Sequence, residues 1–197
     1  MNRRKNFGHR RVLFAGSRSL HSEGLYRLTA DYAASLGVPL LHSEAAGGVT
    51  SLRPVSLMGC SPPCGGGFPD WLLFLLNAGL CRAERVMVYL GAHHCRRERL
   101  AGMLFSCPSG AVCDRDSPEA VGRLLRSSPS TLRAARSSRR LNRKERTVLS
   151  GYLRGMPAHA QARACGLSVK SVYRLRQSGL SRLGLQSLAG LAGAAAF

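Results

Sequence analysis

The segment 141–189 constrains the fold more than any other part of this chain, because its apolar residues recur at helical spacing. A first apolar face runs up to Gly155, a residue type common where helices end. A short Ala-rich piece at 158–164 follows, and Ser168 can then cap a new helix. We therefore predict helices joined by a tight turn, a helix-turn-helix. The apolar residues on one side of its last helix are Val172, Leu175, Leu180 and Leu183.

The other side of that last helix carries cations and hydrogen-bonding groups. A helix-turn-helix that presents such groups outward is typical of DNA-binding proteins. An ordinary amphipathic helix with a solvated basic face is the simpler alternative. The residues expected on this side are Lys170, Ser171, Tyr173, Arg174, Gln177 and Arg182.

The positive charge of the chain is concentrated in the same half. The whole sequence has a formal net charge of +19. Residues 126–197 contain 14 Lys and Arg residues against one acidic residue, whereas residues 1–125 contain 15 against nine. A basic half that also holds a helix-turn-helix favours contact with nucleic-acid phosphates over a merely solubilising surface.

The segment resembles the DNA-binding domain of LuxR/NarL-type (GerE-like) bacterial regulators. The resemblance lies in an ungapped series: L-x-x-x-E-R-x-V-L from Leu141, a Gly at 155, A-R-x-x-G-x-S-x-K-x-V from Ala162, and L-x-R-L-G up to Gly184. It implies an all-α domain of four helices, the last of which (184–197) would form a dimer surface. The chain departs from the family at Pro157, at Ala160-Gln161 and at Leu175.

The resemblance also assigns roles to the residues of the recognition helix. It places Tyr173, Arg174 and Gln177 against base edges in the major groove, where Arg and Gln have the forked geometry for guanine and adenine. The remaining expected contacts are to backbone phosphates, which position the protein without specifying sequence. The phosphate contacts implied are Ser168, Lys170, Ser171, Arg176 and Arg182.

The first 125 residues alternate short apolar runs with helix-like segments, which predicts an α/β domain with a parallel sheet. The continuous run at 71–76 has the hydrophobicity of a central buried strand. Residues 44–68 are rich in Gly, Ser, Pro and Cys, and little regular structure is expected there. We predict strands at 11–17, 38–43, 71–76, 85–90 and 110–114, and helices at 20–36, 96–105 and 117–125.

This order resembles the receiver domain of response regulators, with the phosphorylation chemistry missing. A receiver holds Mg²⁺ with an acidic pair after its first strand, where Gly16 and Ser17 stand. Its phosphate-accepting Asp ends the third strand, which we expect to end at Leu75 or Leu76. Its Lys follows the fifth strand, where Asp114 stands. The resemblance therefore implies a degenerate receiver that forms no aspartyl phosphate.

These expectations combine into a receiver-like domain at 11–125, a basic linker at 126–140 and a helix-turn-helix domain at 141–197. By the resemblance the chain is a bacterial, cytoplasmic, nucleoid-associated transcription regulator that binds specific double-stranded DNA and is not controlled by aspartyl phosphorylation. It would act as a homodimer or as a heterodimer with another LuxR-type regulator. The alternative is an interaction module that pairs with or sequesters such a regulator and binds little DNA itself.

Metal, cofactor and catalytic sites are not expected. The chain has seven cysteines, of which Cys60 and Cys64 lie near His93, His94 and Cys95. The C-x3-C spacing and the adjacent histidines fit a zinc site poorly, although metal binding and redox sensing both stay open for the pair. No constellation supports catalysis, and the apolar run at 71–76 is too short to cross a bilayer.

Overall fold

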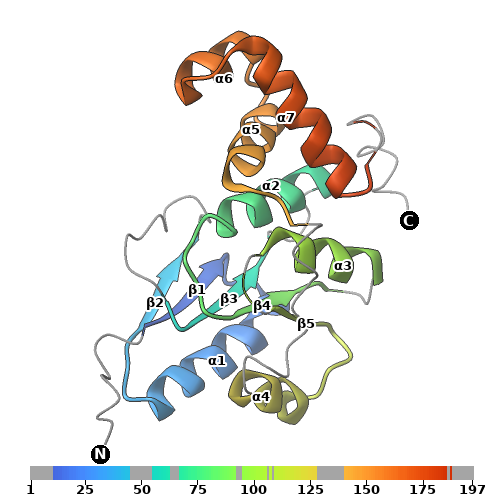
Figure 1. Cartoon of the computed structure of the whole chain (residues 1–197). Helices are drawn as coiled ribbons and strands as arrows, with labels where there is room; N and C mark the ends of the chain where they lie inside the picture. The colour runs from blue at the N-terminus through green and yellow to red at the C-terminus, as the bar shows by residue number, and fades with distance from the viewer. Residues whose placement is uncertain are drawn as a thin grey trace, which may run out of the picture.

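The chain folds around one parallel sheet with helices on both faces. A computed structural model of the whole chain describes residues 11–44, 55–62, 67–91, 95–105, 107, 109–127, 140–185 and 187 (Figure 1). The strands are β1 (Val12–Gly16), β2 (Leu40–Ser43), β3 (Leu57–Ser61), β4 (Val86–Tyr89) and β5 (Ser109–Val112). The helices are α1 (Leu20–Ser35), α2 (Phe68–Ala78), α3 (Cys95–Leu104), α4 (Pro118–Arg126), α5 (Arg143–Leu153), α6 (Ala158–Cys165) and α7 (Val169–Arg182).

The strand order of the sheet is β2-β1-β3-β4-β5, and every pairing is parallel. The connection after β1 leads to β2 on one side, while the chain returns to β3 on the other side of β1. This reversal makes a switch point between β1 and β3, the place where doubly wound α/β sheets leave a crevice at the carboxyl ends of their strands.

Two apolar clusters cover the two faces of the sheet. Helices α1 and α4 lie on one face, where Phe14, Leu25 and Leu125 belong to one buried cluster. Helices α2 and α3 lie on the other face, and α5, α6 and α7 continue the stack beyond α2 (Figure 1). The larger cluster extends from the sheet through α2 into α5 and α7, since it contains Leu75 as well as Leu149. The fold therefore joins the two predicted domains through a shared core.

The expectation of a strand at 71–76 is wrong, because these residues form the middle of α2. The helix is buried on two sides, by the sheet beneath it and by α5 above it, so its sequence is apolar nearly all round (Figure 1). Hydrophobicity alone cannot separate such a helix from a central strand. The local signals that do separate them are Pro69 and Asp70 in the first turn.

The third strand is β3, within the segment where little regular structure is expected. All five of its residues are buried, and they include the small residues Gly59 and Ser61, which carry no strong strand signal. The expected strands at 11–17, 38–43, 85–90 and 110–114 are confirmed within a few residues, as are the helices at 20–36, 96–105 and 117–125. A parallel sheet with additional helices, the predicted class, is thus the observed one.

Two predicted segments fall largely outside the described residues. Most of the linker, 128–139, and nearly all of the predicted fourth helix, 186 and 188–197, belong to this part of the chain. Within the described residues, no helix is both long enough and apolar enough to cross a membrane.

Candidate nucleic-acid interface

The helix-turn-helix is built by local signals at each helix end. Asn142 caps α5 in a reciprocal box, in which its side chain accepts from the Glu145 N–H and the Glu145 carboxylate accepts from the Asn142 N–H, each at 2.8 Å. Gly166 ends α6 in the left-handed conformation (φ +62°), which residues with a Cβ rarely adopt. Two residues later Ser168 caps α7 by accepting the Ser171 N–H at 3.1 Å. The α6–α7 turn is therefore short and well defined.

Helix α7 separates a buried side from an exposed side along most of its length. Val172, Leu180 and Leu183 are buried, with 0%, 6% and 5% of their surface exposed, which confirms them as core residues. Lys170, Tyr173, Arg174 and Gln177 are all exposed, while Ser171 is half-buried beside the cap. The side chains expected to meet base edges thus lie together on the open surface of one helix.

The predicted contact Arg176 has partners within the protein. Its guanidinium lies over the Tyr152 ring at 4.2 Å from the centroid and over the Tyr173 ring at 5.5 Å. It also donates to the Met156 carbonyl at 3.2 Å. Arg176 is half-buried and links α7 to the end of α5. Its phosphate contact stays a prediction.

The predicted contact Arg182 also has partners within the protein, and its side chain is 37% exposed. Its Nε forms an ion pair with Glu145 Oε1 at 3.1 Å, and its Nη1 donates to the Arg140 carbonyl at 3.0 Å. The Glu145 carboxylate also accepts from the Ser178 hydroxyl at 2.7 Å. Glu145 is only 1% exposed. Its buried carboxylate binds groups from the start of α5 and from the end of α7, and so links the two helices. The N-x-x-E spacing of a capping box is the sequence signal for this residue.

The surface of the three helices is basic because their single acid is buried. Residues 141–185 contain nine Lys and Arg residues and one acidic residue, Glu145. Glu145 is neutralised by Arg182, whereas most of the cations are exposed. The exposed cations of this part are Arg143, Lys144, Arg154, Arg163, Lys170 and Arg174. A surface of this kind attracts polyanions and holds no repelling carboxylate among the described residues.

The three helices are anchored on α2 by apolar contacts and a buried arginine. Arg146 is 3% exposed, and its guanidinium donates to the Gly79 carbonyl at 2.8 Å and to the Leu141 carbonyl at 3.2 Å. Burial lowers the pKa of Arg146 to about 10, so the side chain remains a cation at neutral pH. A Cβ at Gly79 would lie 2.0 Å from Arg146 Nη1 and 2.8 Å from the Leu104 carbonyl oxygen. Glycine at 79 is therefore required for this close approach.

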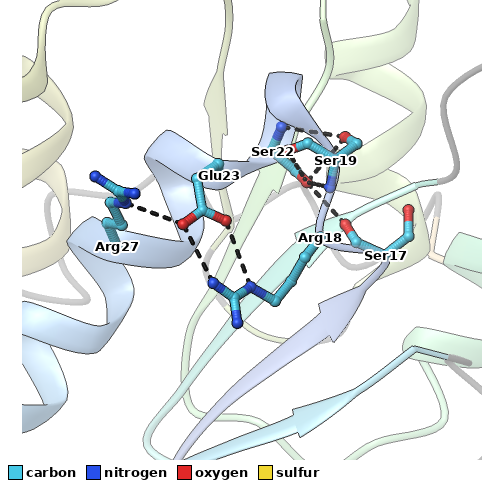
Figure 2. A network of polar contacts seen from close by, with 6 residues as sticks. All are labelled: Ser17, Arg18, Ser19, Ser22, Glu23 and Arg27. Carbon is cyan, nitrogen blue, oxygen red and sulfur yellow. Dashed lines mark hydrogen bonds and ion pairs between the residues drawn. The ribbon is translucent and has the colours of Figure 1, made fainter.

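The carboxyl ends of the strands hold the residues that face the switch point. After β1, Ser17, Arg18 and Ser19 lead into α1, where the Ser22 hydroxyl donates to the Ser17 carbonyl at 2.7 Å (Figure 2). The serines here cap a helix.

A second set of contacts at this junction is ionic. The Glu23 carboxylate accepts from Arg27 at 2.9 Å and from Arg18 at 3.3 Å (Figure 2). The hydrogen bonds from Arg27 and Arg18 lower the pKa of Glu23. Two cations and one anion give this corner a positive excess, opposite to the acidic pair that Mg²⁺ requires.

The other two positions that the sequence resemblance compares with a receiver domain also hold different groups. The third strand ends at Ser61, not at Leu75 or Leu76, and the sequence that follows, PPCGG, contains no carboxylate. After β5, Asp114 is exposed and its carboxylate accepts from the Tyr89 hydroxyl. The carboxyl ends of β1 and β3 therefore offer serine and proline where a receiver has acidic residues.

The cysteine cluster is only partly described. Cys60 is fully buried in β3, and this burial raises the pKa of its thiol well above 9.0, which disfavours the reactive thiolate. Cys64, His93 and His94 lie outside the described residues, as does the side chain of Cys95. Within the described part of the chain, no group of three or more His, Cys, Asp or Glu residues is arranged to hold a metal ion.

No protein-family model matches this chain, and no curated protein sequence matches it. Among solved structures, the RcsB response regulator of Salmonella typhimurium is similar, with 14% identity and a TM-score of 0.43 over 96% of this chain and 100% of that chain. An RcsB–DNA complex is similar with 14% identity and a TM-score of 0.44 over the same shares of the two chains. Full-length FixJ from B. japonicum has 14% identity and a TM-score of 0.41, over 92% of this chain and 94% of that chain.

Proposed function

We propose that this chain is a sequence-specific DNA-binding transcription regulator that inserts α7 into the major groove. The observation that carries the proposal is the exposed side of α7, where Tyr173, Arg174 and Gln177 stand clear of the protein core. The arginine fork matches guanine and the glutamine amide matches adenine. The short, capped turn before α7 holds these groups at the start of a rigid helix, as base recognition requires.

The phosphate contacts that we propose are Ser168, Lys170 and Ser171 at the amino end of α7. The helix amino end carries partial positive charge, and Lys170 adds a full charge beside it. Arg176 and Arg182 are given positioning roles instead, because their guanidinium groups already contact Met156 and Glu145. Exposed cations are also present on α5 and α6.

We propose further that aspartyl phosphorylation does not control this regulator. The support is chemical: serines and Arg18 follow β1, and Ser61 ends β3, so the positions for binding Mg²⁺ and accepting a phosphoryl group hold no carboxylate. Incubation with acetyl phosphate and Mg²⁺ should leave the intact mass unchanged. A phosphorylated Asp in a peptide map would overturn this part of the proposal.

In the proposed scheme the chain acts as a homodimer or pairs with another regulator of the LuxR type. Two copies would place two recognition helices on two half-sites of an operator. Light scattering of the protein alone and with a bound duplex tests this directly. A complex containing one protein chain per duplex, at saturating protein, would contradict dimeric binding.

The experiment that tests the central proposal is a binding titration on genomic fragments at two salt concentrations. Wild type is compared with Arg174→Ala and with Arg123→Ala, which removes an equal charge from an exposed position on α4. We expect wild type and Arg123→Ala to prefer a few fragments, and Arg174→Ala to lose that preference while it keeps salt-sensitive binding. Equal, weak binding of all fragments by wild type would overturn the proposal.

The second candidate is an interaction module that binds another regulator and has little specific DNA binding of its own. One feature favours it: Gln161, a residue of α6, is only 2% exposed, and its Oε1 has no hydrogen-bond partner in the part of the chain that the structure describes. Pro157 also caps α6 without a side-chain hydrogen bond. An unpaired buried polar atom and a missing side-chain cap make α6 less stable than a helix in which both groups are hydrogen-bonded. The same titration separates the two, since uniform weak binding is what the second candidate predicts.

A further inference from the structure

Three of the four large apolar side chains that stand exposed among the described residues gather around the turn after α5 and the start of α7. These are Met156, Val169 and Tyr173, exposed by 36%, 42% and 59%. They border an open hollow of about 440 Å³ between the end of α5 and the start of α7. Exposed apolar groups that cluster in this way mark a contact surface.

The chemistry around the hollow favours a nucleic acid as its occupant. Arg176 forms part of the hollow, and Lys170 and Arg174 are exposed on the same helix. The single acid of residues 141–185, Glu145, is buried elsewhere, in the first turn of α5 and against the last turn of α7. A surface with apolar side chains between cations and without exposed acids complements base edges that lie between phosphates.

Val169 and Tyr173 are adjacent on the surface of α7, because residues four apart lie within about 40° on a helix. Val169 is the first residue of α7, and the first residues of a recognition helix are those that reach base edges. The Tyr173 ring is held by Arg176, whose guanidinium lies 5.5 Å from the ring centroid. The two side chains thus form an apolar edge on α7, the helix that also exposes Gln177 and Arg174.

We propose that Val169 and Tyr173 read the methyl group of a thymine in the major groove. This rests on the proposed function and deepens it, because it adds Val169 as a specificity-determining residue and names the base that it recognises. The C5 methyl is the one apolar group that a base pair presents in the major groove, and apolar side chains are its usual contacts. The adjacent Arg174 and Gln177 then read neighbouring base pairs by hydrogen bonds.

The test begins with the full chain and a pool of random DNA duplexes. Duplexes selected by wild type give a consensus, and each thymidine in it is then replaced singly by deoxyuridine, which removes only the methyl group. We expect one position at which the replacement weakens binding by about threefold to fivefold, the effect of removing one buried methyl group. At that position, Val169→Ala and Tyr173→Ala should bind the thymidine and deoxyuridine duplexes alike.

Two variants serve as matched controls. Tyr173→Phe keeps the ring and should retain the preference for thymidine, while Arg123→Ala changes a distant exposed residue and should behave as wild type. Circular dichroism verifies that every variant is folded.

The failures of the two proposals are distinguishable. If wild type selects a consensus but no deoxyuridine replacement matters, the methyl contact is overturned and the proposed function stands. If the replacement weakens wild type and both alanine variants equally, other residues read the methyl group and the inference is again overturned. If wild type selects no consensus at all, the proposed function fails and the inference with it.

Discussion

The two ends of α7 differ in what surrounds them. Its amino-terminal part exposes Lys170, Tyr173 and Arg174 to solvent, whereas its carboxyl-terminal part buries Leu180 and directs Arg182 onto Glu145. The buried end shares one apolar cluster with α5, α2 and the sheet. Val172 anchors the first half as well, so the difference lies on the outer side: the first half carries fully exposed cations, whereas Arg182 in the last turn has a partner within the protein. Changes at the two ends should therefore have different effects.

The largest expected effect is on the anchored end. Leu149→Ala removes a side chain that is 2% exposed in the cluster shared by both parts of the chain. We expect the free energy of unfolding to fall by roughly 2–5 kcal/mol, the usual cost of a large cavity in a core. Urea unfolding measures it.

Leu175→Ala is the matched control, because Leu175 is only partly buried against a smaller cluster. It should cost clearly less. Equal losses for the two variants would show that the shared core does not dominate the stability of this region.

The second prediction concerns the contact between α2 and the three helices α5, α6 and α7. Gly79→Ala places a methyl group against Arg146 and the Leu104 carbonyl, so we expect about 1–3 kcal/mol of destabilisation from overpacking. Gly24→Ala is its control, since a Cβ there meets nothing within 4 Å. Small-angle scattering should show a larger radius of gyration for Gly79→Ala alone. An unchanged radius together with unchanged stability would contradict a tight contact at this point.

A third test compares substitutions of two arginines on the same helix. Arg174→Ala should leave the unfolding midpoint unchanged and lose about 1–3 kcal/mol of discrimination between operator and mismatched DNA. Arg182→Ala should do the reverse, because it leaves the buried Glu145 without its ion-pair partner and so lowers the midpoint. Thermal unfolding and competition binding are measured for both. If Arg182→Ala lost discrimination between DNA sequences without losing stability, Arg182 would also read the DNA, and the two arginines would not differ as predicted.

The smallest effect is expected at Lys170. Its exposed ammonium group is proposed to contact a phosphate, so Lys170→Ala should weaken binding to all sequences alike. The slope of log affinity against log salt should fall by about one. A change in sequence preference would instead place Lys170 among the base contacts.

Much of the helix-turn-helix could be predicted from sequence because its signals are local. The caps at Ser168 and Gly166 act within one turn, and apolar spacing placed Val172 and Leu180 in the core, as observed. The contacts that Arg176 and Arg182 make within the protein could not be predicted. Their partners, Met156 and Glu145, lie 20 and 37 residues away and meet them only after the helices pack.

In the N-terminal half, too, prediction from sequence failed where the outcome depends on contacts between distant segments. The runs that became β1 and β4 could be predicted because each is short and apolar. The run at 71–76 looked the same but lies in α2, where burial beneath α5 removes the polar face that normally marks a helix. That error also misplaced the third strand, and with it the position compared with the receiver's phosphorylated Asp.

Local patterns were enough to predict most elements of this protein, apart from α2 and β3, together with the basic character of its second half and the side chains that α7 offers to a partner. These follow from caps, spacing and charge, which act over a few residues. The packing of the helices set which elements share a core, which arginines have partners within the protein, and that the fully exposed cations of α7, Lys170 and Arg174, lie in its first half. Those outcomes depend on contacts between segments far apart in the chain, such as Arg146 with Gly79, which no local pattern encodes.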